Sequence, residues 1–471
     1  MKKIIPLLLI LTLVSCSKVA VNLCDEHTFS DRKDYTVGYS IVKQMLTQTK
    51  SDCSLLDIAP YVEDSDTLFY IANFERGWKI IANDQRITPV LAQDDTGNLR
   101  LDSLANENLR FWLDVTADYI KHFDGDENID EIRDNIAFWE SFPEIKIKNK
   151  NLKSPKTKDI FDSLTMENYS WGRELISSTS NTTYNNVDHL TITSWGQRLP
   201  WNVSLGMTND LTGEVQYLLA GCVPVAIGQL FYHLHHTIGK PSGLYHNYSL
   251  ISQSAINGYY YLNFYLYNYQ NPSNRWNAMA IWDELFNPET SCSISDNIRY
   301  VSDYLLYIGY VLGVAYSFTD SGVTSITPTI FSSNGITFNT SSYNANTIET
   351  YIRAGQPVMI TGYTQDGNGH CWLIDAILEE LTQTVNTYRW FRLGDDIFSG
   401  TPPNTTYYTE EDAYNIDPLL YDGKIQVENL SNTNKRWKMN WGWNGESNNA
   451  TFAVFGSLPY PQNINIYYNF Q

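Results

Sequence analysis

A cysteine directly before a predicted helix is the first residue of this chain that is suited to chemistry. Cys222 follows Gly221, and the apolar pattern of residues 223–236 predicts a helix with Pro224 in its first turn, where proline is tolerated because its missing N–H has no partner in the helix. The positive end of a helix dipole favours a thiolate, the nucleophilic form of cysteine. The pattern predicts a nucleophile at Cys222, although a buried structural cysteine has the same local sequence.

A histidine between a glycine-rich turn and an apolar run is the best candidate for the matching base. His370 follows Gly367 and Gly369, and residues 371–374 continue as a buried strand. A neutral imidazole in this position can take the thiol proton. Cys371 should point to the opposite face of the strand, which makes it the weaker nucleophile candidate.

Two further segments carry groups that a cysteine–histidine pair needs. Asn440 could fix the tautomer of the histidine through a hydrogen bond, and Trp441 could shield that bond from water. The side-chain amide of Gln197, together with the Cys222 backbone N–H, could form an oxyanion hole. Each segment alone is equally typical of ordinary packing.

Together, four segments resemble the streptopain family of papain-clan cysteine peptidases. In chain order they are Gln197–Asn202, Gly221–Ala226, Gly369–Asp375 and Asn440–Gly445. The resemblance implies an α+β, papain-like domain with a helical part that carries the cysteine and a β-rich part that carries the histidine. It also implies roles for individual side chains: Cys222 as nucleophile, His370 as base, Gln197 as oxyanion donor, Asn440 and Trp441 as supports of the histidine, and Trp443 and Gly369 in substrate binding.

Residues 17–145 have core signals of their own and resemble the inhibitory propeptide of the same family. Residues 66–74 and 78–82 predict a hairpin around Gly77, and residues 106–123 have a helical apolar pattern. The resemblance implies a zymogen whose propeptide acts as an intramolecular inhibitor of an enzyme with protein or peptide substrates.

The N-terminus predicts export and a lipid anchor. Lys2 and Lys3 precede the apolar run Ile4–Val14, which is too short to cross a bilayer and is typical of a signal peptide. The following Ser15 and Cys16 resemble a bacterial lipobox, with Cys16 as the lipid attachment site. We expect an exported protein that is anchored to the outer membrane or cell surface, or secreted after processing.

These features divide the chain into a signal peptide (1–16), a propeptide domain (17–145), a linker or maturation region (146–182) and a peptidase domain (183–471). The linker prediction is based on a cluster of lysines without apolar periodicity. Residues 379–436 exceed the usual spacing of the family, and we interpret them as an insertion near the cleft that affects gating or specificity.

Composition narrows the range of functions. The chain has 471 residues, a formal net charge of −20 and 18% charged residues, which argues against nucleic-acid binding because phosphates need clustered cations. We expect no cofactor and no metal, although His233 and His236 lie one helical turn apart and could face a metal. Two different functions stay open: a surface lipoprotein that binds peptides or inhibits proteases without catalysis, and another papain-clan reaction such as amide transfer.

Overall fold

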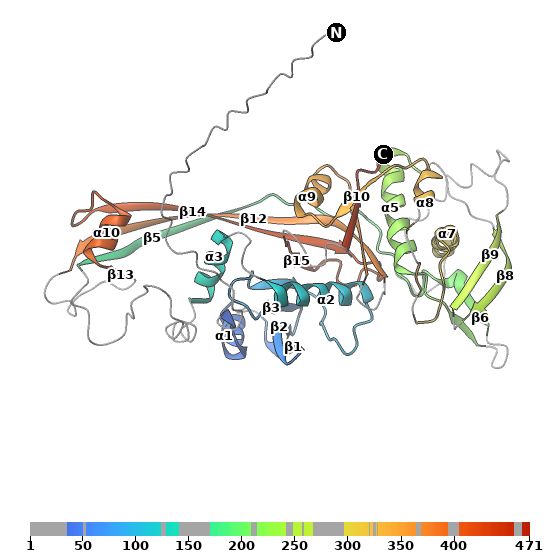
Figure 1. The fold of residues 1–471 in the computed structure, drawn as a ribbon, viewed down its shortest axis with the longest axis horizontal. Helices are drawn as coiled ribbons and strands as arrows, with labels where there is room; N and C mark the ends of the chain where they lie inside the picture. The colour runs from blue at the N-terminus through green and yellow to red at the C-terminus, as the bar shows by residue number, and fades with distance from the viewer. Residues whose placement is uncertain are drawn as a thin grey trace, which may run out of the picture.

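The computed structural model is an elongated molecule in which a long sheet connects a helical end to an extended arm (Figure 1). It describes residues 35–49, 53–123, 129–140, 170–208, 214–241, 248–256, 259–266, 296–319, 321–323, 326, 328–363, 369–393, 405–455 and 464–471. The signal peptide with Cys16 lies outside the described residues. No helix in the described part is long and apolar enough to cross a membrane.

The N-terminal part, called the prodomain below, is a small four-stranded sheet with helices. Its elements are α1 (Tyr39–Thr49), β1 (Leu55–Glu63), β2 (Asp66–Phe74), β3 (Trp78–Ala82), β4 (Val90–Asp94), α2 (Glu107–His122) and α3 (Ile129–Glu140). The predicted hairpin is confirmed, since β2 and β3 are antiparallel. Gly77 between them has a φ of +80°, and a Cβ there would collide with the backbone of Asp94. The predicted helix is α2, and the Asn106 side chain caps it by accepting a hydrogen bond from the Leu109 N–H.

The helical end of the catalytic part carries the cysteine. Its elements are η3 (Val203–Leu205), β6 (Gly206–Thr208), β7 (Val215–Tyr217), α5 (Cys222–Ile238), β8 (Tyr248–Ile256), β9 (Tyr259–Leu266), α7 (Asp296–Leu312) and α8 (Thr329–Ser332). Helix α5 is the helix predicted after Cys222. It packs on α7. Gly228 allows the close approach of the two helices, because a Cβ at this position would lie only 2.7 Å from a Leu305 methyl group.

The β-rich part carries the histidine and shares its sheet with the prodomain. Its elements are β10 (Asn339–Ser342), α9 (Ala345–Arg353), β11 (Val358–Tyr363), β12 (Gly369–Arg392), β14 (Ile425–Asn440), β15 (Thr451–Ala453) and β16 (Ile464–Tyr468). The strand order is β1-β2-β3-β4-β15-β14-β12-β11-β16-β10. Since β4 pairs with β15 antiparallel, the prodomain sheet continues directly into the catalytic sheet.

One hydrophobic core contains residues of both parts. From the prodomain it includes Ile80 of β3 and Leu113 of α2, both fully buried. From the catalytic part it includes four tryptophans, Trp372, Trp437, Trp441 and Trp443. The two parts are therefore joined by packed side chains as well as by strand pairing.

A second core lies at the helical end. It holds α5 and α7 together and includes Cys371 and Leu373 of β12. Side chains on one face of β12 thus belong to the first core, and side chains on its other face belong to the second.

The remaining strands form a long arm that projects away from the helical end. Strands β5 (Trp171–Tyr184) and β13 (Thr405–Tyr408) and helix α10 (Glu410–Ile416) complete it. Strand β12 pairs with β14 on one side and with β5 on the other. A small core of Trp171, Trp390, Ala413 and Leu420 closes its tip.

The arm corrects two predictions. Residues 171–182 are not linker but part of β5, because they fill the edge of β12 with backbone hydrogen bonds. The insertion at 379–436 lies mostly in the arm and not near the cleft. Strand β12 runs from Gly369 to Arg392, and its stretch from His370 to Trp390 spans roughly 65 Å at about 3.3 Å per residue. Helix α10 lies at the opposite end of the molecule from α5 (Figure 1).

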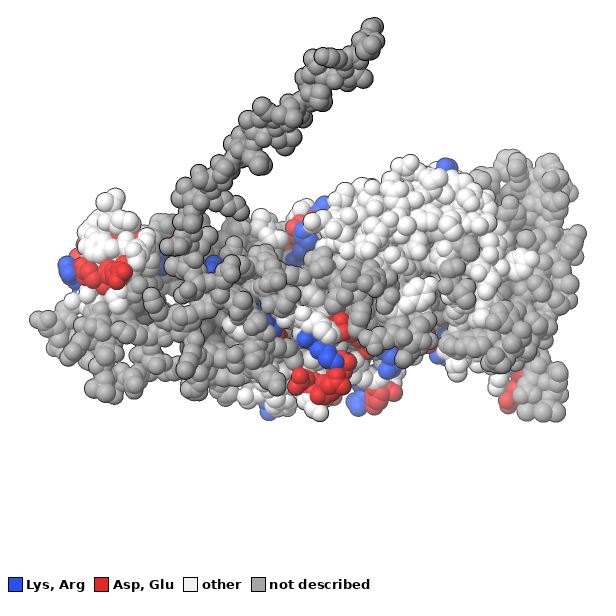
Figure 2. Space-filling model, in the orientation of Figure 1, with Lys and Arg blue, Asp and Glu red and all other residues white. Residues whose placement is uncertain are grey.

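Charged side chains on the face drawn in Figure 2 gather at the arm tip and over the prodomain. Ion pairs balance both places: Arg392 pairs with Glu410 beside α10, and Lys121 pairs with Glu63 and Asp64 in the prodomain. These ion pairs neutralise part of the acidic charge in each region.

Candidate active site

Cys222 is the first residue of α5, and the backbone before it turns sharply. Gly221 has a φ of +89°, and no side chain caps the N-terminus of the helix. The thiol therefore lies at the positive end of the α5 dipole. It is 6% exposed, and its Sγ donates to the Gly369 carbonyl oxygen at 3.8 Å.

The structure brings Cys222, His370 and Gly369 to one cavity of about 210 Å³. Its other walls come from α5, β11, β16 and the segment around Val323, and they include Tyr363. The nucleophile candidate and the base candidate, 148 positions apart in the chain, thus line the same cavity.

Gln197 has a side-chain donor without a partner. The residue is 2% exposed, and its Nε2 lacks a hydrogen bond within the described part of the chain. The backbone carbonyl oxygen of Gln197 accepts a hydrogen bond from the Ala220 N–H at 3.0 Å. This bond holds Gln197 beside the segment that leads into Cys222. A buried amide that is left unpaired suits a donor reserved for a charge that develops during a reaction.

The prodomain helix α2 covers His370. The rings of Phe111 and His370 stack with centroids 5.0 Å apart and an interplanar angle of 20°. Phe111 also meets Trp372 edge to face. The His370 Nδ1 atom is buried and has no hydrogen-bond partner among the described residues. In this state the imidazole is held by an aromatic contact rather than by a polar one.

Asn108, on the same helix, binds both catalytic segments. Its Nδ2 donates to the Cys371 carbonyl oxygen at 2.9 Å and to the Trp441 carbonyl oxygen at 2.6 Å. The side chain is fully buried. Asn108 and Phe111 together attach α2 to the strand that carries the histidine.

Burial keeps both reactive groups uncharged in this state. Desolvation, followed by the negative charge of Glu107 in the first turn of α2, raises the pKa of Cys222 to about 12. Desolvation lowers the pKa of His370 to about 4. The thiolate–imidazolium pair is therefore disfavoured while α2 is in place.

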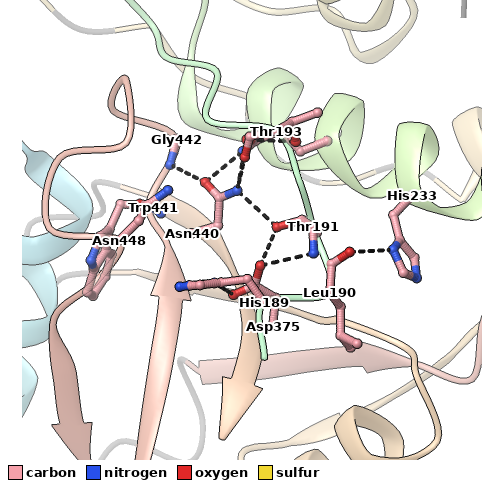
Figure 3. Close-up of polar contacts among 11 residues, drawn as sticks. His189, Leu190, Thr191, Thr193, His233, Asp375, Asn440, Trp441, Gly442 and Asn448 are labelled. Carbon is pink, nitrogen blue, oxygen red and sulfur yellow. Dashed lines mark hydrogen bonds and ion pairs between the residues drawn. The ribbon is translucent and has the colours of Figure 1, made fainter. Parts of the chain in front are cut away.

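The Asn440 side chain makes no hydrogen bond to His370 in this state, contrary to the role suggested by the sequence. Its Nδ2 donates to Thr191 Oγ1 at 3.0 Å and to the Thr193 carbonyl oxygen at 2.6 Å (Figure 3). It also donates to Gln229 Oε1 at 2.9 Å. Its Oδ1 accepts from Gln229 Nε2 at 3.1 Å. The amide is fully used in this buried network and has no capacity left for the histidine.

The same network continues to a buried carboxylate. Asp375 accepts hydrogen bonds from the Thr191 N–H and hydroxyl and from His189 Nδ1 (Figure 3). Thr191 thereby links Asp375 to Asn440. The network holds the end of β14 at Asn440 and thereby positions the next residue, Trp441.

The two tryptophans after Asn440 have different surroundings. Trp441 packs on Trp372 with centroids 5.4 Å apart, on the strand that carries His370. Trp443 is 5% exposed and lies under the Arg198 guanidinium, and it does not line the cavity that contains Cys222. A substrate contact of Trp443 thus stays a prediction, whereas Gly369 lies on the cavity wall.

His233 on α5 binds backbone oxygens. Its Nδ1 and Nε2 lie 3.0 and 3.1 Å from the carbonyl oxygens of Leu190 and Gly355. Among the described residues, no group of three or more His, Cys, Asp or Glu side chains could hold a metal ion. The ring nitrogens of His233 therefore connect α5 to neighbouring segments.

Sequence reasoning missed Phe111 and Asn108. The signal that could have found them is the width of the apolar face of α2: Phe111 and Trp112 add a second face to the one formed by Leu109 and Leu113. A helix that is apolar on several sides is buried on several sides.

The burial of His370 predicts an acid-sensitive precursor. Its folded-state pKa of about 4 lies below the usual value of 6.5, so protonation favours the opened or unfolded states. The contribution of His370 to stability should be fully present above pH 6.5, be lost as the pH drops from 6.5 to 4, and change no further below that. Thermal unfolding of the Cys222→Ala precursor across this range measures the effect. A His370→Ala variant in the same background should lose part of the pH dependence; an unchanged profile would contradict the assignment.

Comparison with known proteins agrees with this arrangement. The model of the peptidase C10 family matches residues 195–450, more than half of the chain. The model of the Spi protease inhibitor family matches residues 37–120. No curated protein matches the chain.

The solved structures that are similar to the chain include two of interpain A. A fragment of prointerpain A from Prevotella intermedia has 12% sequence identity and a TM-score of 0.43, covering 88% of this chain and 97% of its own. Active interpain A from the same organism has 14% identity and a TM-score of 0.33, covering 60% of this chain and 94% of its own. On the match of residues 195–450, the chain belongs to the peptidase C10 family, the family of streptopain, and is a cysteine endopeptidase made as a zymogen with an inhibitory prodomain.

Proposed function

We propose that the mature enzyme hydrolyses peptide bonds with a Cys222–His370 dyad. The observation that carries the proposal is the shared cavity: a thiol at the N-terminus of α5 and an imidazole at the start of β12 line the same space. Helix α2 covers the imidazole in the precursor. Removal of α2 rehydrates both groups, which lowers the pKa of the thiol and raises that of the imidazole.

The proposed reaction uses these two groups and the Gln197 amide. The Cys222 thiolate attacks the peptide carbonyl, and the oxyanion is stabilised by the Cys222 N–H and the Gln197 amide. Protonated His370 gives its proton to the leaving amine. Water, activated by the neutral imidazole, then hydrolyses the thioester and regenerates the thiol.

Replacing Gln197 with alanine tests the oxyanion hole. Loss of one such donor lowers turnover by about 10²–10³-fold. We expect the variant to fold, because the Gln197 Nε2 has no partner to lose among the described residues. Casein hydrolysis by the mature enzyme measures the change, and Gln216→Ala, the same substitution at an exposed position of β7, is the matched control. Wild-type turnover in Gln197→Ala would remove Gln197 from the mechanism.

We propose further that the protein is exported and anchored through a lipid on Cys16, or released after processing. The support is the sequence of the N-terminus, with its short apolar run before Ser15 and Cys16. Metabolic labelling with a radioactive fatty acid should mark the wild-type chain and not Cys16→Ser. Equal labelling of both chains would exclude this anchor.

A lipoprotein that binds peptides without catalysis is the alternative. Such a protein needs no reactive thiol, whereas the proposed dyad requires one at Cys222. Labelling by a thiol-directed epoxide after removal of the prodomain distinguishes the two.

A further inference from the structure

The outer edge of β5 is a strand edge without a partner in the described part of the chain. Strand β13 covers only the first four residues of this edge, by pairing with Trp171–Glu174. At the other end, Arg353 of α9 donates to the Asn185 carbonyl oxygen at 3.1 Å. Between these two limits, residues 175–184 pair with β12 on their inner side.

The backbone groups of β5 alternate between its two sides. The Asn185 N–H donates to the Glu379 carbonyl oxygen, in the continuation of the ladder with β12. In an antiparallel ladder, every second residue bonds the same neighbour. The N–H and C=O groups of Ser178, Ser180 and Thr182 therefore point outward.

The edge lacks the prolines and charged side chains that normally protect an exposed strand. Residues 175–184 contain no proline, no lysine and no other charged residue, although such residues usually prevent pairing at an open edge. Strand β14, on the other side of β12, carries Glu428 and Lys435. The chemistry of β5 thus favours the addition of another strand.

The sequence of β5 is complementary to itself. Its two exposed large apolar side chains are Ile176, at the bulge where the register with β12 shifts, and Tyr184, with exposures of 49% and 64%. They lie four positions before and four positions after Ser180. An antiparallel copy related by a twofold axis at Ser180 brings Ile176 of each chain beside Tyr184 of the other. The same register pairs Ser178 with Thr182, whose outward backbone groups match.

We infer that two copies of this chain associate through β5, in an antiparallel pair with its twofold axis at Ser180. This interface is isologous, as in most homodimers. It joins two arms into one continuous sheet. The cavities that contain Cys222 lie at the far ends of the two chains, so the association is independent of the proposed catalytic mechanism.

Charge substitutions at the axis test this association. The test uses the Cys222→Ala precursor, because this substitution prevents self-processing. With increasing protein concentration, the molar mass measured by light scattering should approach twice the mass of one chain. Ser180→Lys and Ser180→Asp should each remain monomeric because like charges meet at the axis, and their mixture should associate again. Ser431→Lys on β14 is the matched control and should behave like the parent protein.

Cysteine cross-links test the register. Residues in a hydrogen-bonded antiparallel pair have Cα atoms about 5.5 Å apart, within disulfide range. Ser180→Cys alone should form a cross-linked dimer on oxidation. Thr182→Cys alone should not, whereas a mixture of Ser178→Cys and Thr182→Cys should.

Three results would overturn the inference. The first is a parent protein that stays monomeric at all concentrations, and the second is cross-linking without this register dependence. The third is a monomer whose casein hydrolysis responds to Ser180→Lys in the active background, which would assign the edge to substrate instead.

Discussion

Cys222→Ala is expected to abolish self-processing and casein hydrolysis. The proposed mechanism has no other nucleophile in the cavity, and removal of a protease nucleophile lowers turnover by about 10⁶-fold. Mass spectrometry of the purified precursor, incubated under reducing conditions, reports the loss of cleavage and, for the wild type, the position of the cut.

Cys371→Ala is the matched control. This thiol is also buried and lies next to His370 in the chain, but its side chain packs in the core with α5 and α7. The variant should keep activity within a few-fold of the wild type. Loss of activity in a folded Cys371→Ala protein, together with cleavage by Cys222→Ala, would reverse the assignment of the nucleophile.

Phe111→Ala is expected to open the precursor. The substitution removes the ring that stacks on His370 and contacts Trp372, and a buried phenylalanine-to-alanine change costs about 3–5 kcal/mol. Since about 1.4 kcal/mol corresponds to a factor of ten, the open fraction of the precursor should rise by about 10²-fold or more. The rate at which iodoacetamide alkylates Cys222 in the intact precursor, followed by peptide mass mapping, measures that fraction.

Lys121→Ala on the same helix is the control. Its ion pairs with Glu63 and Asp64 lie at the surface, where water and salt screen the charges and such pairs contribute little to stability. The alkylation rate should therefore stay near that of the wild type. Equal rates in Phe111→Ala and the wild type would show that the stacked ring does not restrain the site.

The sequence was sufficient for the elements with strong local signals. The hairpin around Gly77, helix α2 and helix α5 each have a clear apolar period or a turn residue with positive φ, and the structure has all three. The arm was missed because its strands are rich in Ser, Thr and Asn. Without apolar residues that alternate, residues 171–184 do not differ from a polar linker in sequence.

Contacts between distant segments were harder to predict. The hydrogen bond suggested between Asn440 and His370 is absent because the Asn440 amide is used by Thr191, Thr193 and Gln229, which come from two other regions of the chain. The contact of Phe111 with His370 depends on how the prodomain docks. A local pattern gives the type of a residue, but its partner is set by the tertiary fold.

The shared core has a consequence for activation. Since the strand pairing of β4 with β15 and the contacts of α2 with Trp372 do not depend on the connecting chain, a single cut between the two parts leaves a nicked two-chain complex. Full activity then requires dissociation or digestion of the excised piece, and its departure exposes a tryptophan-rich face to water. The slow step of activation would be this separation, and a burst of soluble prodomain fragments should accompany the rise in activity.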